Sequence, residues 1–256
     1  MIIEQKVDQS KVPIVMKTIG VIGGIGPQAT MDFEARIHKV SQNLIPQHVN
    51  AGYPPMVVYY LRHAPILLGE TNTGDHIKPD PRLLEVSAKL GPLCDFLVLP
   101  SNTPHFFQKQ IEAASGREVL SMVSATLEKV RKLKLERVGV LAVGHALRNG
   151  LYQERLTRLG IPWETIPDKM TAKLDESIWS LMEGRENDKS REVVWEAVNY
   201  LRSKSVDGII LGCTELPLLL KCDDDAFLIN PAQILAEAAV KYAIYDLPSP
   251  TEVKLK

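Results

Sequence analysis

The chain contains two short segments of the same design, and they constrain its fold more than any other feature. Residues 97–103 (LVLPSNT) and residues 209–215 (IILGCTE) are each an apolar run that ends at a small nucleophilic side chain. That side chain is Ser101 in the first segment and Cys213 in the second, and a threonine follows each within two residues. Short apolar runs of this kind are typical of buried parallel strands. The repetition predicts two similar half-domains whose strand ends face each other across one small site.

Short β-branched runs alternate with amphipathic helical stretches along the chain, a pattern typical of parallel sheets with crossover helices. The first strands of two series, near Gly20 and Gly139, are about as far apart as Ser101 and Cys213. We therefore predict an α/β protein of two pseudo-symmetric domains, each with a parallel sheet flanked by helices, with the active site in the cleft between them. The expected strands lie at 17–22, 56–61, 95–100, 137–142, 163–166 and 207–211, and the expected helices at 33–44, 103–114, 147–159, 173–183, 190–203 and 232–245.

The expected first half-domain consists of residues 17–121 plus 231–246, and the expected second half-domain consists of residues 122–230. The last helix would return to pack on the first half, which would make that domain discontinuous. Residues 1–16 are interpreted as an N-terminal tail, because charged residues interrupt their apolar ones and exclude a signal peptide.

Composition and charge exclude several classes of function. The formal net charge of −1 gives no overall attraction to nucleic acid or to an anionic membrane. The apolar runs are far shorter than the ~20 residues that span a bilayer. Three cysteines, Cys94, Cys213 and Cys222, have spacings that fit neither a disulfide framework nor a zinc site. We therefore expect no metal and a reducing cytoplasm, with Cys94 and Cys222 as structural bystanders.

The two nucleophile segments end at a position where open parallel sheets bind ligands, the carboxyl ends of strands. Backbone N–H groups of Asn102, Thr103, Thr214 and Glu215 would be unpaired at a helix start and available to an anion. A helix N-terminus also lowers the pKa of a nearby thiol, which makes Cys213 a candidate base or nucleophile. The alternative is a buried cysteine that acts as a small hydrophobe. The polar residues after Cys213 favour the ligand pocket.

Three motifs together resemble the aspartate/glutamate racemase superfamily: IGGIGPQAT (22–30), PSNTPH (100–105) and LGCTELP (211–217). The resemblance extends from about residue 17 to residue 245. It implies two α/β domains, a homodimer, a small amino-acid or dicarboxylic-acid substrate, and racemisation without cofactor or metal. One cysteine acts on each face of the α-carbon in such families.

The resemblance assigns roles to individual residues of this sequence. Cys213 matches the second catalytic cysteine of the superfamily. Asn102, Thr103, Thr214 and Glu215 match residues that line the site or hold the α-carboxylate of the substrate.

Ser101 departs from the pattern, because two-cysteine members of the superfamily have cysteine there. A serine hydroxyl has no acidic proton near neutral pH, so it would need a partner to act as a base, and His105 is the nearest candidate. Three outcomes stay open. The enzyme racemises slowly or mainly from one enantiomer, with Ser101 or a water as the weaker acid. It performs one-sided chemistry on a malonate- or maleate-like acid, as the arylmalonate decarboxylases that resemble this superfamily do. Or it binds an amino acid without catalysis.

The loop at 24–29 (GIGPQA) also satisfies the dinucleotide-binding pattern G-x-G-x-x-A. Pro27 interrupts the tight turn that this pattern needs, and the second strand ends in Arg62 and His63 instead of an acidic residue. We therefore interpret the loop, including Gly26, as one wall of a small-substrate pocket.

Three further residues are candidates of a weaker kind. Arg62 could clamp a second substrate carboxylate bidentately, and a surface ion pair is the alternative. Lys173 could bind a carboxylate, although its position favours a solvated helix face. Asn230 stands where aspartate racemases more often have an acidic residue.

Overall fold

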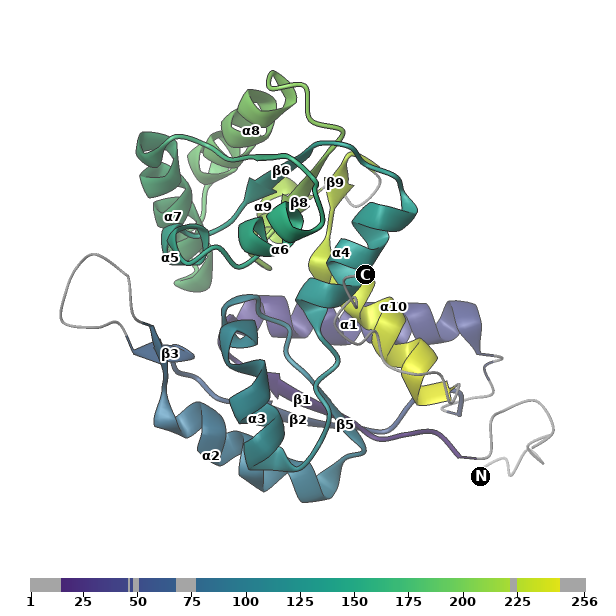
Figure 1. The fold of residues 1–256 in the computed structure, drawn as a ribbon. Coiled ribbons are helices and arrows are strands. Elements are labelled where there is room, and N and C mark those ends of the chain that lie inside the picture. Colours follow the sequence, from purple (N-terminus) through teal and green to yellow (C-terminus); the bar gives the residue numbers. More distant parts are fainter. Residues whose placement is uncertain (1–14, 46, 48–50, 68–76, 222–224, 245–256) are drawn as a thin grey trace, which may run out of the picture.

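The structure is a computed structural model that describes residues 15–45, 47, 51–67, 77–221 and 225–244. Two separate parallel sheets organise the chain, one formed mainly by its first part and one by its second part (Figure 1). This arrangement confirms the predicted fold class. Most of the expected N-terminal tail, as well as Cys222, Tyr245 and residue 246, lies outside the described residues.

The first sheet has the strand order β2-β1-β5, and β1 pairs in parallel with both neighbours. Its central strand is buried along its whole length, as expected for an apolar run covered on both faces. The strands of this sheet are β1 (Ile19–Gly23), β2 (Met56–Tyr60) and β5 (Phe96–Val98). The α-helices of the first part are α1 (Pro27–Leu44), α2 (Pro81–Leu90) and α3 (Gln108–Ser115). Two 3₁₀ turns, η2 (Gly91–Leu93) and η3 (Thr103–Phe107), also belong to this part. A short antiparallel pair, β3 (Ile66–Leu67) and β4 (Lys78–Pro79), lies between β2 and α2 in the sequence.

The second sheet has the strand order β7-β6-β8-β9, again with parallel pairing throughout. Its central strands β6 and β8 are completely buried. Its strands are β6 (Val138–Leu141), β7 (Trp163–Glu164), β8 (Gly208–Leu211) and β9 (Leu228–Ile229), and the helices of this part are α5 (Gly144–Arg148), α6 (Gln153–Arg158), α7 (Asp168–Met182), α8 (Asp188–Arg202) and α9 (Leu216–Leu220).

The two sheets repeat one topology. In each, the first strand is central, the second strand lies on one side and the third strand lies on the other. The repeat continues beyond the third strand, because Leu97 of β5 forms an isolated parallel bridge with Val119, where β8 pairs with β9. The third strands, β5 and β8, precede Ser101 and Cys213 respectively. The two nucleophile positions are therefore equivalent in the repeated topology.

A long helix follows each sheet and packs toward the other half. The helix α4 (Met122–Lys132) comes after the first sheet and places Val123, Leu127 and Val130 in a core with β6. The helix α10 (Pro231–Ile244) comes after the second sheet and shares a core with β1 and α1. Figure 1 shows α10 lying across α1 in the region between the two sheets. The exact limits of the half-domains stay a prediction.

Two expected helices differ from the structure. The helix expected at 147–159 is divided into α5 and α6, because Gly150 adopts a left-handed backbone with φ of 68° between them. The helix expected at 103–114 begins as the 3₁₀ turn η3 and becomes α-helical only at Gln108. Pro104 lies in its first turn, where its missing N–H is tolerated. No helix within the described residues is long and apolar enough to cross a membrane.

Candidate active site

The predicted site residues lie in loops at the carboxyl ends of the strands in both sheets, and they meet where the two halves touch. Gly26 follows β1, Asn102 and Thr103 follow β5, and Glu215 follows β8. A Cβ atom built on Gly26 would overlap Oε1 of Glu215. This contact joins the first half to the second without space for a side chain on Gly26.

Cys213 and Glu215 form a buried hydrogen-bonded pair. The thiol of Cys213 donates to Oε2 of Glu215 over 2.9 Å, and the hydroxyl of Thr214 donates to the same oxygen over 3.2 Å. All three side chains are buried. The Glu215 carboxylate is therefore placed to take the proton of the thiol.

The environment of Cys213 favours the protonated thiol. Burial raises its pKa well above the ordinary value, and the charges of Glu215 and Asp175 add to this. Burial also raises the pKa of Glu215, against the hydrogen bonds from Cys213 and Thr214. The expectation that a helix N-terminus lowers the pKa of this thiol is therefore wrong. The helix after it, α9, has five residues, and burial beside a carboxylate outweighs its dipole.

Asn102 and Thr103 contact side chains of the other half. Oδ1 of Asn102 accepts a 2.6 Å hydrogen bond from the hydroxyl of Tyr152, and Oγ1 of Thr103 lies 3.0 Å from Nε2 of His145. Asn102 is 4% exposed, and its Nδ2 group is buried with no hydrogen-bond partner among the described residues. A buried donor without a partner is costly, and such groups are characteristic of ligand sites.

His105 does not partner the hydroxyl of Ser101, and here the structure corrects the prediction. Nδ1 of His105 lies 2.9 Å from the backbone oxygen of Ser101, and Nε2 accepts from the backbone N–H of Met122 over 3.1 Å. Burial lowers the pKa of His105 to about 4, so the ring is neutral and both nitrogens are engaged. His105 therefore fixes the loop that carries Ser101 to the start of α4. Ser101 itself is partly buried.

The structure does not bring the weaker candidates into contact with Cys213. Arg62 is exposed, and its guanidinium lies over the ring of Tyr60, 4.8 Å from the centroid. His63 lies 3.0 Å from the guanidinium of Arg82. Lys173 is exposed on α7, as its solvated interpretation predicts.

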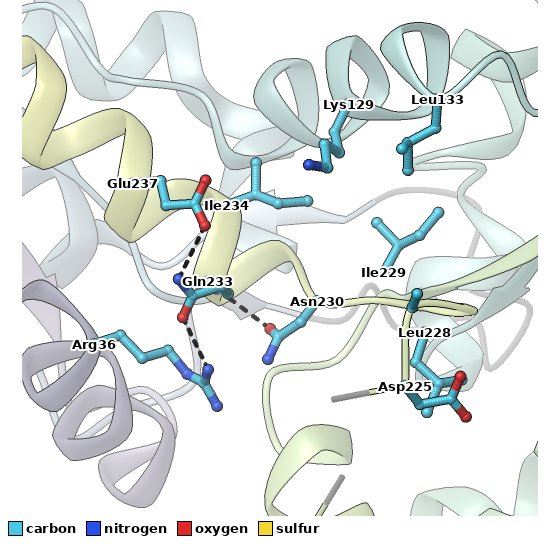
Figure 2. Close-up of a pocket in the computed structure, with 11 residues that line it drawn as sticks. Arg36, Lys129, Leu133, Asp225, Leu228, Ile229, Asn230, Gln233, Ile234 and Glu237 are labelled. Carbon is cyan, nitrogen blue, oxygen red and sulfur yellow. Dashed lines mark hydrogen bonds between the residues drawn. The ribbon is translucent and has the colours of Figure 1, made fainter. Parts of the chain in front are cut away.

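Asn230 has a structural role in this arrangement. Its Oδ1 accepts the backbone N–H groups of Ala232 and Gln233, so it caps the start of α10. It also lines a pocket of about 390 Å³ between α1, α4, β9 and α10, together with Arg36 and Lys129 (Figure 2). None of the predicted catalytic residues lines this pocket, so we place the candidate active site elsewhere, at the contact between Gly26 and Glu215.

Sequence reasoning missed four residues around the site. His145 and Tyr152 reach Thr103 and Asn102 as described above. Asp175 accepts the backbone N–H of Gly144 over 3.1 Å, and burial raises its pKa. The Nε2 group of Gln28 donates to the backbone oxygens of Leu181 and Met182 across the two halves. Gln28 lies within the motif at 22–30, but its partners do not follow from that motif, and no local pattern identifies the other three. Each of the four contacts a segment far away in the sequence.

The loop with the dinucleotide pattern, residues 24–29, lies against a carboxylate, which does not suit a dinucleotide cofactor. Dinucleotide folds place a pyrophosphate against the glycine loop and the helix start. Here the Glu215 carboxylate occupies that position beside Gly26. A second anion there would be repelled, which agrees with our interpretation of the loop as a wall of the site. Among the residues with a described position, no group of three or more His, Cys, Asp or Glu could hold a metal ion.

Comparison with known proteins gives matches along most of the chain. The family described as Asp/Glu/Hydantoin racemase matches residues 22–239. The broad specificity amino-acid racemase RacX from Bacillus subtilis (strain 168) is 23% identical over 231 residues, which are 89% of this chain and 99% of RacX.

Two solved structures show the same fold. The aspartate racemase of Picrophilus torridus has a TM-score of 0.70 and 22% identity, and the match covers 89% of this chain and 94% of that one. The aspartate racemase homologue from Pyrococcus horikoshii OT3 has a TM-score of 0.68 and 22% identity, covering 89% of this chain and 99% of that one.

Proposed function

Because the chain belongs to the Asp/Glu/hydantoin racemase family, we propose that it is a cofactor-independent amino-acid racemase or epimerase in which Cys213 exchanges the α-proton of the substrate. The observation that carries this proposal is the hydrogen bond from the Cys213 thiol to the Glu215 carboxylate. A buried thiol beside a carboxylate has both a proton to give and a group that can take that proton away. The relation to RacX, named as an amino-acid racemase, supports the same class of reaction.

The proton transfers follow from this pair. Glu215 takes the thiol proton and leaves Cys213 as a thiolate, which then removes the α-proton of the amino acid and becomes a thiol again. The substrate carries the negative charge as a carbanion stabilised by its carboxylate group. When Cys213 returns its proton to the same face, the thiolate takes back the proton that Glu215 holds. When Ser101 or a water protonates the opposite face instead, the alkoxide or hydroxide left behind is neutralised by the proton that Glu215 releases to solvent, and all groups return to their starting states. The raised pKa of Glu215 makes this carboxylate a better proton acceptor than an exposed one.

In this proposal, the first half of the protein faces the opposite side of the α-carbon, and its proton donor is weaker than the Cys213 thiol. Gly26, Ser101, Asn102 and Thr103 carry no charge, and both ring nitrogens of His105 are engaged with the backbone. We therefore assign Cys213 as the one strong base and Ser101, or a water beside it, as the weak acid of the other face. Return of the proton to the original face should outpace inversion.

The substrate carboxylate is assigned to the neutral donors of the first half. Asn102 and Thr103 offer an amide and a hydroxyl there, whereas the hydroxyl of Thr214 already donates to Glu215, so Thr214 stays a prediction as a carboxylate ligand. Arg62 stays a prediction as the ligand of a second carboxylate, because its guanidinium would first have to leave the ring of Tyr60.

A second candidate function is a decarboxylase or isomerase of a malonate- or maleate-like acid. The one-sided distribution of titratable groups favours it, because such chemistry needs only one thiol. Release of carbon dioxide from substituted malonates would identify the decarboxylase. Thermal stabilisation by an amino acid that is never turned over would instead identify a binding protein.

The proposal is tested by substituting the two described cysteines separately. Cys213→Ala should reduce α-proton exchange of the best substrate by at least about 10³-fold, because the base is removed. Cys94→Ala is the matched control, since Cys94 is also buried and donates to the backbone oxygen of Leu90 away from the site. Exchange that persists at full rate in Cys213→Ala would overturn the assignment.

A further inference from the structure

In the side-chain amide of Asn102, the oxygen has a hydrogen-bond partner and the nitrogen has none among the described residues. Its Oδ1 accepts the Tyr152 hydroxyl over 2.6 Å, while its buried Nδ2 group has no hydrogen-bond partner among the residues that the structure describes. Three buried side-chain atoms of the described chain lack a partner, and two of them, on Asn102 and Gln28, follow adjacent strands of the first sheet. The amide of Asn102 thus offers a donor to a ligand.

The direction of this hydrogen bond is fixed by chemistry. A phenol donates its one proton, and an amide oxygen can only accept. Burial raises the pKa of Tyr152 above its ordinary value, so the hydroxyl keeps that proton. A rotated amide would instead donate from its NH₂ group to the Tyr152 oxygen, and the phenol proton would lose Oδ1 as its acceptor. Tyr152 therefore selects the orientation in which Nδ2, and not Oδ1, faces the open side.

Tyr152 belongs to the second half, and Asn102 belongs to the first. Tyr152 directly precedes α6, whereas Asn102 lies between β5 and η3. The neighbouring contact between Thr103 and His145 crosses the same boundary. The side chains of Asn102 and Thr103 in the first half are thus oriented by side chains of the second half. Their geometry depends on the two halves being in contact.

We propose that Tyr152 is a positioning residue that orients the Asn102 amide so that its NH₂ group binds a carboxylate oxygen of the substrate. The inference rests on the proposed function, because it places the substrate at the end of β5. The substrate group that binds the Asn102 NH₂ group is expected to be an anionic oxygen that accepts a hydrogen bond. A group that has donors but no acceptor, such as an ammonium group, is rejected there.

The test is the kinetics of Tyr152→Phe, measured as α-proton exchange in deuterium oxide over a range of substrate concentrations. This substitution removes one oxygen and frees the amide to rotate. We expect KM to rise about tenfold with kcat within twofold of wild type, because a charge-assisted hydrogen bond is lost before the chemical step. Tyr242→Phe is the matched control, since the Tyr242 hydroxyl donates to Glu118 on the surface. A KM for Tyr152→Phe within twofold of wild type would overturn the proposal.

A double-mutant cycle with Asn102→Ala separates positioning from general damage. If Tyr152 acts through Asn102, then Tyr152→Phe should add no further increase of KM in the Asn102→Ala background. An equal increase in both backgrounds would contradict the proposal. Asn102→Asp is a second variant, which keeps the acceptor for Tyr152 and removes the donor. It should shift the preference from amino acids toward their carboxamides, and an unchanged preference would also contradict the proposal.

The outcomes distinguish this inference from the proposed function. If wild type exchanges α-protons and Tyr152→Phe does so with the same KM, the function stands and the positioning role fails. If wild type exchanges none, the same variants are compared by thermal stabilisation with L-aspartate, D-aspartate and malonate. Stabilisation that Tyr152→Phe weakens would support the carboxylate site without catalysis. The absence of any stabilisation would overturn both.

Discussion

At the scale of single residues, we propose that the pair of Cys213 and Glu215 carries out the proton transfers. Glu215 acts on the thiol in two opposite ways. Its negative charge and its hydrogen bond keep Cys213 protonated at rest, and its carboxylate is also the group that can accept the proton. The pair titrates as a unit, so the two effects must be separated by experiment.

Glu215→Gln separates them. The variant removes the charge and the acceptor, so we expect the pKa of Cys213 to fall while α-proton exchange falls by about 10²–10⁴-fold. The pKa is measured from the pH dependence of Cys213 alkylation by iodoacetamide in the Cys94→Ala background. A higher pKa would contradict the effect of the Glu215 charge on the thiol, and exchange at the wild-type rate would mean that Glu215 does not accept the thiol proton.

In the proposed mechanism, Ser101 limits proton transfer on the face of the α-carbon opposite Cys213. Ser101→Cys places a thiol at the equivalent position of the first half, so we expect the rate of inversion to rise at least about tenfold relative to exchange with retention. Chiral chromatography of the amino acid against time gives the inversion rate. Ser101→Ala is the comparison, and a similar inversion rate in both variants would show that the substrate does not lie between positions 101 and 213.

The sequence motifs predict where residues lie relative to the strands. Cys213, Asn102 and Glu215 could be placed after strands from their short polar motifs, and their catalytic and binding roles stay a prediction. Tyr152 and His145 could not, since their partners lie far away in the sequence and in the other half. The raised pKa of the thiol was also not predicted. Cys213 lies in the hydrophobic core of the second half beside the Glu215 carboxylate, and this burial outweighs the effect of the short helix.

At the scale of elements, the strand ends position the site and His105 fixes one of them. Its ring joins the backbone of Ser101 after β5 to the first residue of α4. Only the neutral ring with its proton on Nδ1 makes both hydrogen bonds. Protonation of Nε2 would break the bond from Met122 in a fully buried place.

This contact predicts a dependence of stability on pH. Burial lowers the pKa of His105 from its ordinary value of 6.5 to about 4 in the folded protein, so the unfolded chain binds the proton more readily. The free energy of unfolding should therefore decrease as pH falls from 6.5 to 4, by about 3 kcal/mol from this residue. In His105→Gln the side chain does not titrate, so its free energy of unfolding should decrease by about 3 kcal/mol less than that of wild type over the same pH range. Urea unfolding at several pH values checks this, and equal losses in the two proteins would contradict it.

Most strands could be predicted because a buried parallel strand is a continuous apolar run in the sequence. The helices were less predictable. The stretch at 147–159 has helical periodicity throughout, yet Gly150 turns the chain and divides it. That break places Tyr152 before α6, where its hydroxyl donates to Asn102. Tertiary contact between the halves determines this geometry.

At the scale of the whole molecule, two halves of similar topology have different side chains at equivalent strand ends. The second half brings Cys213, Glu215 and Asp175 together, and the matching loops of the first half supply neutral donors. Gly26 and Glu215 form a close contact between the halves. Repetition of the fold therefore does not imply repetition of the base.

Gly26→Ala tests this contact. The added Cβ would overlap Oε1 of Glu215, so the carboxylate or the halves must shift. We expect a loss of about 1–3 kcal/mol in the free energy of unfolding and slower exchange. Adding Glu215→Asp shortens the acid and should restore part of the stability, as thermal unfolding would show. A further loss in the double variant would mean that this contact does not cause the strain.

The central claim is that Cys213 of the second half is the one strong base. The most direct test is proton NMR of the reduced wild-type enzyme in deuterium oxide with separate L and D enantiomers, followed by chiral analysis. We predict that the α-proton of one enantiomer is lost faster than the other enantiomer forms. Exchange from both enantiomers at equal rates, with each loss accompanied by inversion, would contradict the claim and indicate two equivalent bases.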